Sequence, residues 1–208
     1  MKILLRRRHT ACLVIALSAL AGCSSAPQRE AEWIDPGIGA QSRFLKGEKI
    51  LIACDAYDAA VRQICQDQMY REVLAKGATP VVLPAGTVLL NDRELDGQLV
   101  ANAPAVAAKA VFVMTLTPAT SSAGSGLSLG IGGFSVGSGG GVGVDLSAPI
   151  GGGRVNTGFA ANGRVTDARN NRLVWTATLV AVPSADLNAQ FSTLSRSMLD
   201  LAQNAGLF

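Results

Sequence analysis

Histidine is nearly absent from this chain, and its scarcity excludes several kinds of enzyme. The only histidine is His9, close to the N-terminus. Serine and cysteine hydrolases use an imidazole as the general base, and histidine is the commonest side-chain ligand for metals. Three aspartates near one another, Asp55, Asp58 and Asp67, are better explained as a helix cap and solvated charges than as a metal site. We therefore predict no catalytic residue, no metal and no cofactor.

The sequence also lacks an apolar run long enough to span a membrane. The run at residues 11–20 has ten residues, whereas a spanning helix needs about 20. It follows the basic residues Lys2 and Arg6 to Arg8, and small residues come after it, so residues 1–22 have the three parts of a secretory signal peptide. The four residues Leu20-Ala21-Gly22-Cys23 resemble a bacterial lipobox.

A lipobox implies that Cys23 takes a diacylglycerol, that the chain is cut before it, and that the new amine is acylated, for example with palmitate. Ser24 occupies the next position, and by resemblance to known lipoprotein sorting a residue other than aspartate there favours the outer membrane. Residues 23–45 are predicted to be a lipidated tether, and residues 46–208 a periplasmic domain. The expected location is the outer membrane, facing the periplasm and held by acyl chains.

Charge gives no indication of a nucleic-acid partner. The whole chain has a net charge of +3, but the leader holds four of its 18 basic residues. The rest of the chain has 14 basic and 15 acidic residues, which gives it a net charge of −1. A basic surface is the usual electrostatic signature of nucleic-acid binding. We therefore expect a membrane contact through the acyl anchor and an envelope protein partner or self-association, and no nucleic acid.

Apolar periodicity predicts an α/β domain. Residues 49–54 form a continuous apolar run typical of a buried strand. A helix from Asp58 to residue 76 follows, with an apolar stripe and a glycine, Gly77, at its C-terminal cap. Residues 79–83 are the next strand, so this region is a βαβ unit. The stripe consists of Val61, Cys65, Met69 and Val73.

The rest of the chain is also predicted to consist of strands and helices. Residues 89–109 are expected to be helical in pieces, and residues 110–117, 156–166 and 173–182 to be strands. Asn170-Asn171 suits the turn before the last strand, and a final helix begins after Ser184. The predicted fold is α/β, with a mixed sheet of about four to five strands, helices packed on one face, and a Gly-rich hairpin or loop insertion.

The insertion, residues 121–153, has three possible roles. Residues 124–153 hold 13 of the 23 glycines, and apolar residues alternate with Gly or Ser on either side of a glycine run. Such a segment can be a surface loop. It can also be a hairpin that pairs with a partner or another subunit, or a hairpin inserted in a membrane as part of an oligomeric barrel.

Cysteine spacing predicts one disulfide. With Cys23 acylated, Cys54 and Cys65 remain in an oxidising compartment. Cys54 ends the first strand of the βαβ unit, and Cys65 lies two turns into the following helix on the face expected to meet the sheet. We therefore predict a Cys54–Cys65 bond. The spacing is not Cys-x-x-Cys, which disfavours redox catalysis.

The lipobox, the Gly-rich stretch after the third strand and the hairpin motif Asp167…Leu173-Val174-Trp175 together resemble a poorly characterised family of Gly-rich bacterial outer-membrane lipoproteins. The order of elements is also similar to the periplasmic domain of the curli secretion channel and to the lipoprotein activators of penicillin-binding proteins. The absence of histidine after the leader, together with the alternating Gly-rich segment, favours a non-enzymatic envelope binding or assembly module anchored by Cys23. The alternative is an oligomeric secretion or pore component that uses the Gly-rich hairpin.

Overall fold

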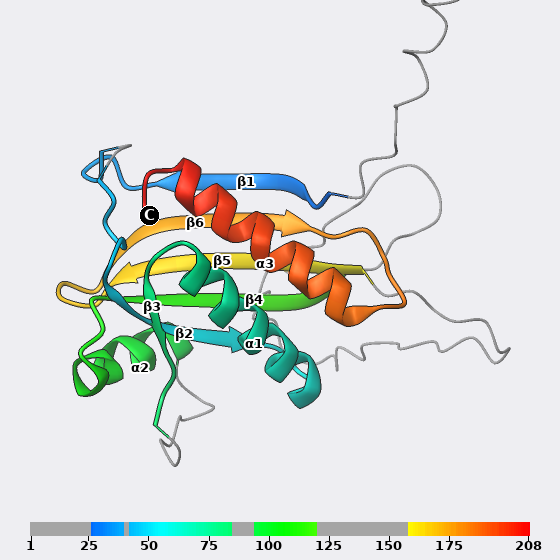
Figure 1. The fold of residues 1–208 in the computed structure, drawn as a ribbon, viewed down its shortest axis with the longest axis horizontal. Helices are drawn as coiled ribbons and strands as arrows, with labels where there is room; N and C mark the ends of the chain where they lie inside the picture. The colour runs from blue at the N-terminus through cyan, green and yellow to red at the C-terminus, as the bar shows by residue number, and fades with distance from the viewer. Residues whose placement is uncertain (1–25, 40–41, 85–93, 120–157) are drawn as a thin grey trace, which may run out of the picture.

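The computed structural model describes residues 26–39, 42–84, 94–119 and 158–208 (Figure 1). The signal peptide, the lipidation site Cys23 and the Gly-rich segment 121–153 lie outside the described residues, so the predictions made for them stay predictions. Among the described residues, no helix is both long and apolar enough to cross a membrane.

The described residues form one mixed sheet with helices on it. The strands are β1 (Gln28–Ile34), β2 (Lys49–Asp55), β3 (Thr79–Val81), β4 (Ala110–Ala119), β5 (Gly158–Asp167) and β6 (Arg172–Val180). The helices are α1 (Ala59–Ala75), α2 (Leu95–Asn102) and α3 (Leu187–Asn204), and a short 3-10 helix, η1 (Ala103–Val106), follows α2. The strand order is β1-β6-β5-β4-β2-β3 (Figure 1).

The topology confirms the predicted α/β fold and the βαβ unit. Strand β2 runs parallel to both β3 and β4, with α1 as the crossover between β2 and β3. Strands β4, β5, β6 and β1 are antiparallel to their neighbours. The sheet has six strands instead of four to five, because the predicted tether contributes one of them.

The prediction that residues 23–45 are only a tether is wrong for its central part. Strand β1 pairs along its length with β6, from Gln28 opposite Val180 to Ile34 opposite Trp175. Six of the seven β1 residues are exposed, so the strand lacks the apolar alternation by which a sequence reveals a strand. Backbone hydrogen bonds to β6 hold it in the sheet.

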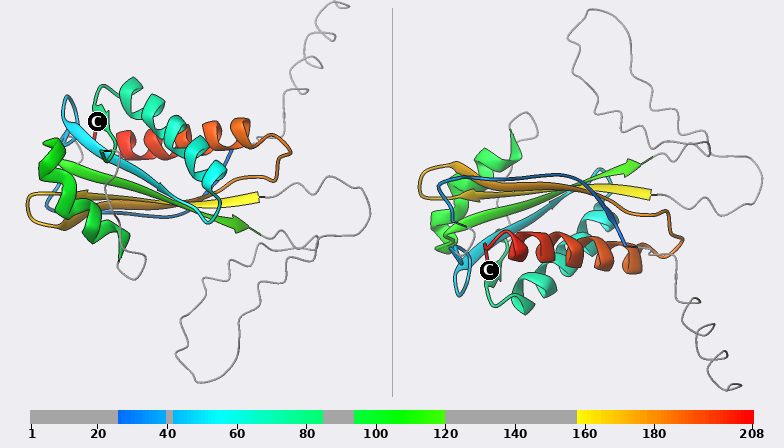
Figure 2. Two further views of the ribbon diagram at one scale, coloured as in Figure 1. Left: turned by 90° about the horizontal axis from the view of Figure 1, so that it is seen from below. Right: turned by 90° about the horizontal axis from the view of Figure 1, so that it is seen from above.

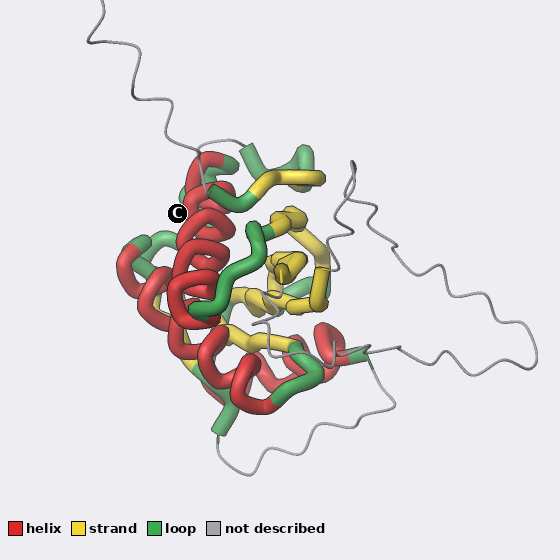
Figure 3. The backbone as a smooth tube through the Cα atoms, turned by 90° about the vertical axis from the view of Figure 1, so that its right-hand side faces the viewer, coloured by secondary structure: helices red, strands yellow, loops and turns green. Residues whose placement is uncertain are grey.

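Both faces of the sheet carry helices, which corrects the prediction of helices on one face. Helices α1 and α3 lie side by side on one face, and α2 lies on the other (Figures 2 and 3). The reason lies in β2, where Ile50 and Ile52 belong to the main core under α1 and α3, and Leu51 belongs to a smaller core with Leu99 of α2. A strand that is apolar on both sides needs cover on both.

Local signals at the helix ends are largely confirmed. Asp58 caps α1, because its Oδ1 accepts a hydrogen bond from the Val61 backbone N–H at 2.9 Å. Gly77 follows α1 with a φ of +83°, in the left-handed region that favours glycine. The predicted cap of the last helix is wrong by two residues: Asp186, not Ser184, accepts the N-terminal hydrogen bond of α3.

The β5–β6 hairpin forms at the predicted turn. Asn171 has a φ of 53°, as the turn requires. Trp175 is fully buried, and its ring meets that of Phe112 edge-on with the centroids 5.9 Å apart. Its indole N–H donates to Glu32 of β1 at 3.1 Å, so the edge strand supplies the polar partner that a buried tryptophan needs.

Candidate functional site

Four chain segments meet at one end of the sheet, which we call the sheet pole. The pole consists of the start of β1, the end of β4, the start of β5 and the end of β6 with the residues after it. Gln28 is opposite Val180, and Ala119 is opposite Gly158. The pole lies at the right of the sheet in Figure 1 and faces the viewer in Figure 3. It therefore brings the first residue of β1 to the same end of the sheet as Ala119 and Gly158, the two residues that flank segment 120–157.

A pocket of about 150 Å³ opens at the sheet pole. We refer to it as the pole pocket. Val182, one of its wall residues, is 51% exposed, which is high for a large apolar side chain. The surface of the pocket is mostly apolar, and its lining consists of Gln28, Ala119, Gly158, Val180, Ala181, Val182 and Pro183.

Hydrogen bonds hold the walls of the pole pocket in place. The Ala181 backbone N–H donates to the Phe159 carbonyl at 2.9 Å, and the Gln190 side-chain amide of α3 donates to the Val182 carbonyl at 2.8 Å. A Cβ at Gly158 would lie 3.3 Å from the carbonyl oxygens of both Ala119 and Ala181. The space at the start of β5 is therefore tight for any side chain, and the hydrogen-bonded backbone fixes the shape of the pocket.

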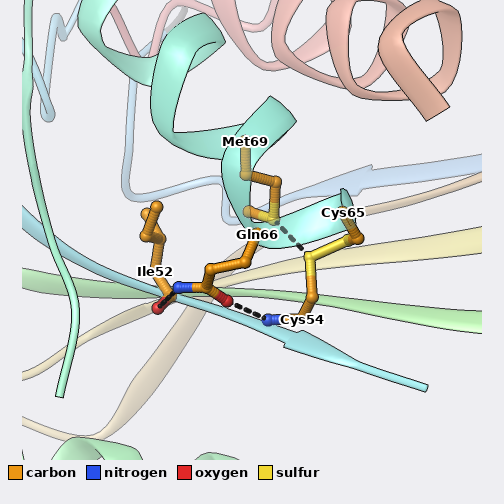
Figure 4. The surroundings of a disulfide bond; sticks show 5 residues. All are labelled: Ile52, Cys54, Cys65, Gln66 and Met69. Atoms are coloured by element: carbon orange, nitrogen blue, oxygen red, sulfur yellow. Dashed lines mark hydrogen bonds between the residues drawn. A yellow bond between two sulfur atoms is a disulfide. The ribbon is translucent and has the colours of Figure 1, made fainter. Parts of the chain in front are cut away.

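The predicted disulfide joins α1 to β2 (Figure 4). Cys54 and Cys65 are bonded, with their Cα atoms 6.0 Å apart. Gln66 reinforces the link, since its Oε1 accepts from the Cys54 N–H and its Nε2 donates to the Ile52 carbonyl, both at 2.9 Å. Met69 Sδ lies 3.3 Å from Cys54 Sγ. Because a disulfide sulfur carries no proton, this is a packing contact between sulfurs, and the bond has a structural place in the core.

An ion pair on the face of the sheet that α2 covers was not predicted from the sequence. Arg164 of β5 donates twice to Asp96 of α2, from Nε at 2.6 Å and from Nη2 at 2.8 Å. It also donates to Asn162 Oδ1 at 2.8 Å. The Asp96 carboxylate raises the pKa of Arg164 further, mainly through these hydrogen bonds. With both carboxylate oxygens engaged, the pair holds α2 against the sheet and leaves no free nucleophile. The two residues are 68 positions apart, and a single sequence carries no signal that pairs them.

The aspartates singled out in the sequence do not form a metal site. Asp58 caps α1, and Asp67 accepts a hydrogen bond from Gln63 at 2.9 Å. No group of three potential metal ligands occurs within the described ranges. Asp167, the first residue of the hairpin motif, accepts hydrogen bonds from the Arg169 backbone and guanidinium. These hydrogen bonds lower the pKa of Asp167 below its usual value, and the Arg169 side chain makes the largest contribution.

Comparison with known proteins gives only a distant similarity. No protein-family model matches the chain, and no curated protein matches it. Two solved structures of the PelC dodecamer from Paraburkholderia phytofirmans, one of them a single-residue variant, are 11% identical to it. They cover 88% of this chain and 99% of their own, with a TM-score of 0.48. A similarity this distant brings no function with it, and the resemblances noted from the sequence stay predictions.

Proposed function

We propose that this chain is a non-enzymatic lipoprotein of the bacterial outer membrane that binds or assembles envelope partners through its Gly-rich segment. Acyl chains on Cys23 hold the domain at the periplasmic face of the membrane. The segment 121–153 is the element that meets the partner. One observation carries the proposal: the sheet pole brings the start of β1 and both flanks of the Gly-rich segment to the same end of the domain.

The short connection between Cys23 and the domain limits how far the sheet pole can lie from the membrane. Five positions separate Cys23 from Gln28 at the pole. A fully extended chain of that length spans about 17 Å, at 3.3–3.6 Å per residue. A domain anchored at Cys23 therefore keeps its pole close to the membrane. The Gly-rich segment then leaves the domain on the membrane side, where another envelope protein or a second copy can meet it.

Lipid anchoring is tested by Cys23→Ala. The variant lacks the thiol that receives the diacylglycerol, so it should incorporate no labelled palmitate and should be lost from the outer-membrane fraction. Ser25→Ala is the matched control, because it changes a residue two positions after Cys23 and leaves both the lipobox and the Cys54–Cys65 bond intact. Normal palmitate labelling of Cys23→Ala would contradict the proposal.

The role of the Gly-rich segment is tested by deleting residues 124–153. Ala119 and Gly158 are paired neighbours, so a short turn can close the gap without disturbing β4 or β5. The deleted protein should melt cooperatively by circular dichroism and should lose the partner crosslinks that the full chain forms in cells. A folded deletion that keeps every crosslink would move the partner surface to the α/β domain. A deletion that cannot fold would assign the segment to the core.

An oligomeric secretion or pore component is the second candidate, and the edge strand β1 favours it. Strand β1 pairs with β6 on one side, and no described strand pairs with its other side. An unpaired edge is a template for strand addition. Light scattering on the detergent-extracted protein decides between the two functions. A ring-sized particle would support the pore component, and a monomer would exclude it.

A further inference from the structure

We propose that the pole pocket binds one of the acyl chains carried by Cys23 of the same molecule. The inference rests on the proposed lipid anchor and goes beyond it, because it assigns a lipid-binding site within the folded domain. The remaining acyl chains stay in the membrane, and the pocket holds the domain in one orientation on the bilayer surface.

The chemistry of the pocket suits a hydrocarbon chain. Its lining is mostly apolar, and Gln28 is its one side chain with a polar group. An apolar cavity of about 150 Å³ takes a molecule the size of benzene in other proteins. A pocket of this volume therefore fits a section of an acyl chain, and it lacks the converging polar groups that a polar ligand needs.

The position of the pocket selects the occupant. Gln28 is both a wall of the pocket and the first residue of β1, five positions after the lipidated cysteine. An acyl chain linked through about 17 Å of peptide is present near the pocket at a high effective concentration. A hydrocarbon chain from elsewhere has no such connection, so the chain's own lipid is the favoured ligand.

The pocket is ready to bind before the lipid arrives. Its walls are held by the hydrogen bonds from Ala181 to Phe159 and from Gln190 to Val182. A bare backbone at Gly158 keeps the space between Ala119 and Ala181 free of a side chain. A preformed apolar site of this kind binds its ligand without the cost of ordering a loop.

The test uses the full chain in cells fed a palmitate analogue with a diazirine near its end. After irradiation, the monomer band is digested with trypsin and analysed by mass spectrometry. Peptide 23–29 carries the lipid, and peptide 173–196 carries residues 180–183 of the pocket wall. We expect these two peptides to be joined through the acyl chain.

Two variants with similar exposure provide the comparison. Val182→Asp places a carboxylate at the pocket and should reduce the 23–29 to 173–196 link at least five-fold. Val82→Asp is the control, because Val82 is 47% exposed against 51% for Val182 and follows β3 at the other edge of the sheet. It should leave the link unchanged.

A longer connection gives a third measurement. Ten residues inserted after Ser25 lengthen the connection from five to 15 residues. Effective concentration falls as about the −3/2 power of linker length, so the link should decrease roughly five-fold while palmitate incorporation stays the same.

The outcomes separate the two proposals. A labelled Cys23 whose acyl chain links only to free lipid or to other peptides would overturn the pocket and leave the lipid anchor standing. An equal loss in Val182→Asp and Val82→Asp would do the same. A chain with no label on Cys23 would overturn both.

Discussion

Reducing the Cys54–Cys65 disulfide should lower the free energy of unfolding by about 3 kcal/mol. The bond joins residues 11 positions apart. Closing a loop of this length removes entropy from the unfolded chain worth about 3 kcal/mol in the loop-entropy model. For a chain of 150–250 residues, each kcal/mol shifts the melting temperature by about 2–4 °C. Reduction should therefore lower it by roughly 6–12 °C.

The assay is urea unfolding of a chain that begins at Ser24, with and without dithiothreitol. This chain contains only Cys54 and Cys65, so the reductant acts on one bond and removes no atom from the core. Both the midpoint and the slope must enter the free energy, because the crosslinked unfolded chain is more compact and exposes less surface. The double variant Cys54→Ala/Cys65→Ala should lose more than 3 kcal/mol, since it adds a cavity, and should not respond to dithiothreitol.

Gln66 continues to hold α1 against β2 after the disulfide is reduced. Its two hydrogen bonds to β2 are independent of the sulfur chemistry, so the reduced chain should still fold with α1 in place. Gln66→Ala should cost about 1–3 kcal/mol, at 0.5–1.5 kcal/mol for each hydrogen bond. Equal midpoints and slopes for the oxidised and reduced chains would refute the entropic argument. Two alkylatable thiols in unreduced protein would show that the bond does not form.

Three further predictions follow from the packing and charges of the sheet. A Cβ at Gly163 would lie 2.6 Å from the buried Met198 Sδ, so Gly163→Val should cost about 1–3 kcal/mol in urea unfolding, and Met198→Ala should cost less in that variant than in the parent chain. Arg164→Ala should cost about 1–3 kcal/mol, because its carboxylate partner is only 16% exposed, and Arg164→Lys should not restore the loss, since lysine lacks the bidentate fork. The pKa of Asp167 is lowered in the folded state, so its contribution is full above the unfolded value of about 3.9 and is lost as the pH falls through the lower folded value. Arg169→Ala should thus be less stable than the parent at pH 6, with a difference that shrinks on acidification; a difference that grows towards low pH would contradict this sign.

Features with a local cause could be predicted from the sequence. The βαβ unit follows from a continuous apolar run, a helical stripe and a glycine at the end of the helix. Asp58 caps its helix because the capping carboxylate and the Val61 N–H that donates to it lie within three residues of each other. The disulfide also belongs to this group, because a short strand-to-helix connection fixes how Cys54 and Cys65 meet.

Features that depend on distant segments could not be predicted. Strand β1 has six exposed residues, and only its backbone pairing with β6 makes it a strand. The position of α2 is only partly a matter of local pattern: the apolar run of β2 indicates that both of its faces are covered, and it does not show which helix covers each. The contact between Asp96 and Arg164 joins two charges that separately look like ordinary surface residues.

The sheet pole is a product of topology more than of any side chain. Strand β4 continues into β5 as an antiparallel neighbour, so the end of one and the start of the other must lie at the same end of the sheet, whatever joins them. Strand β1 is antiparallel to β6, and β6 to β5, so β1 begins at that end as well. Point substitutions in the domain therefore leave Gln28, Ala119 and Gly158 at the same end of the sheet. If the proposed lipid anchor holds, substitutions in the apolar pocket beside Val182 are the ones that should change how the acyl chain is bound.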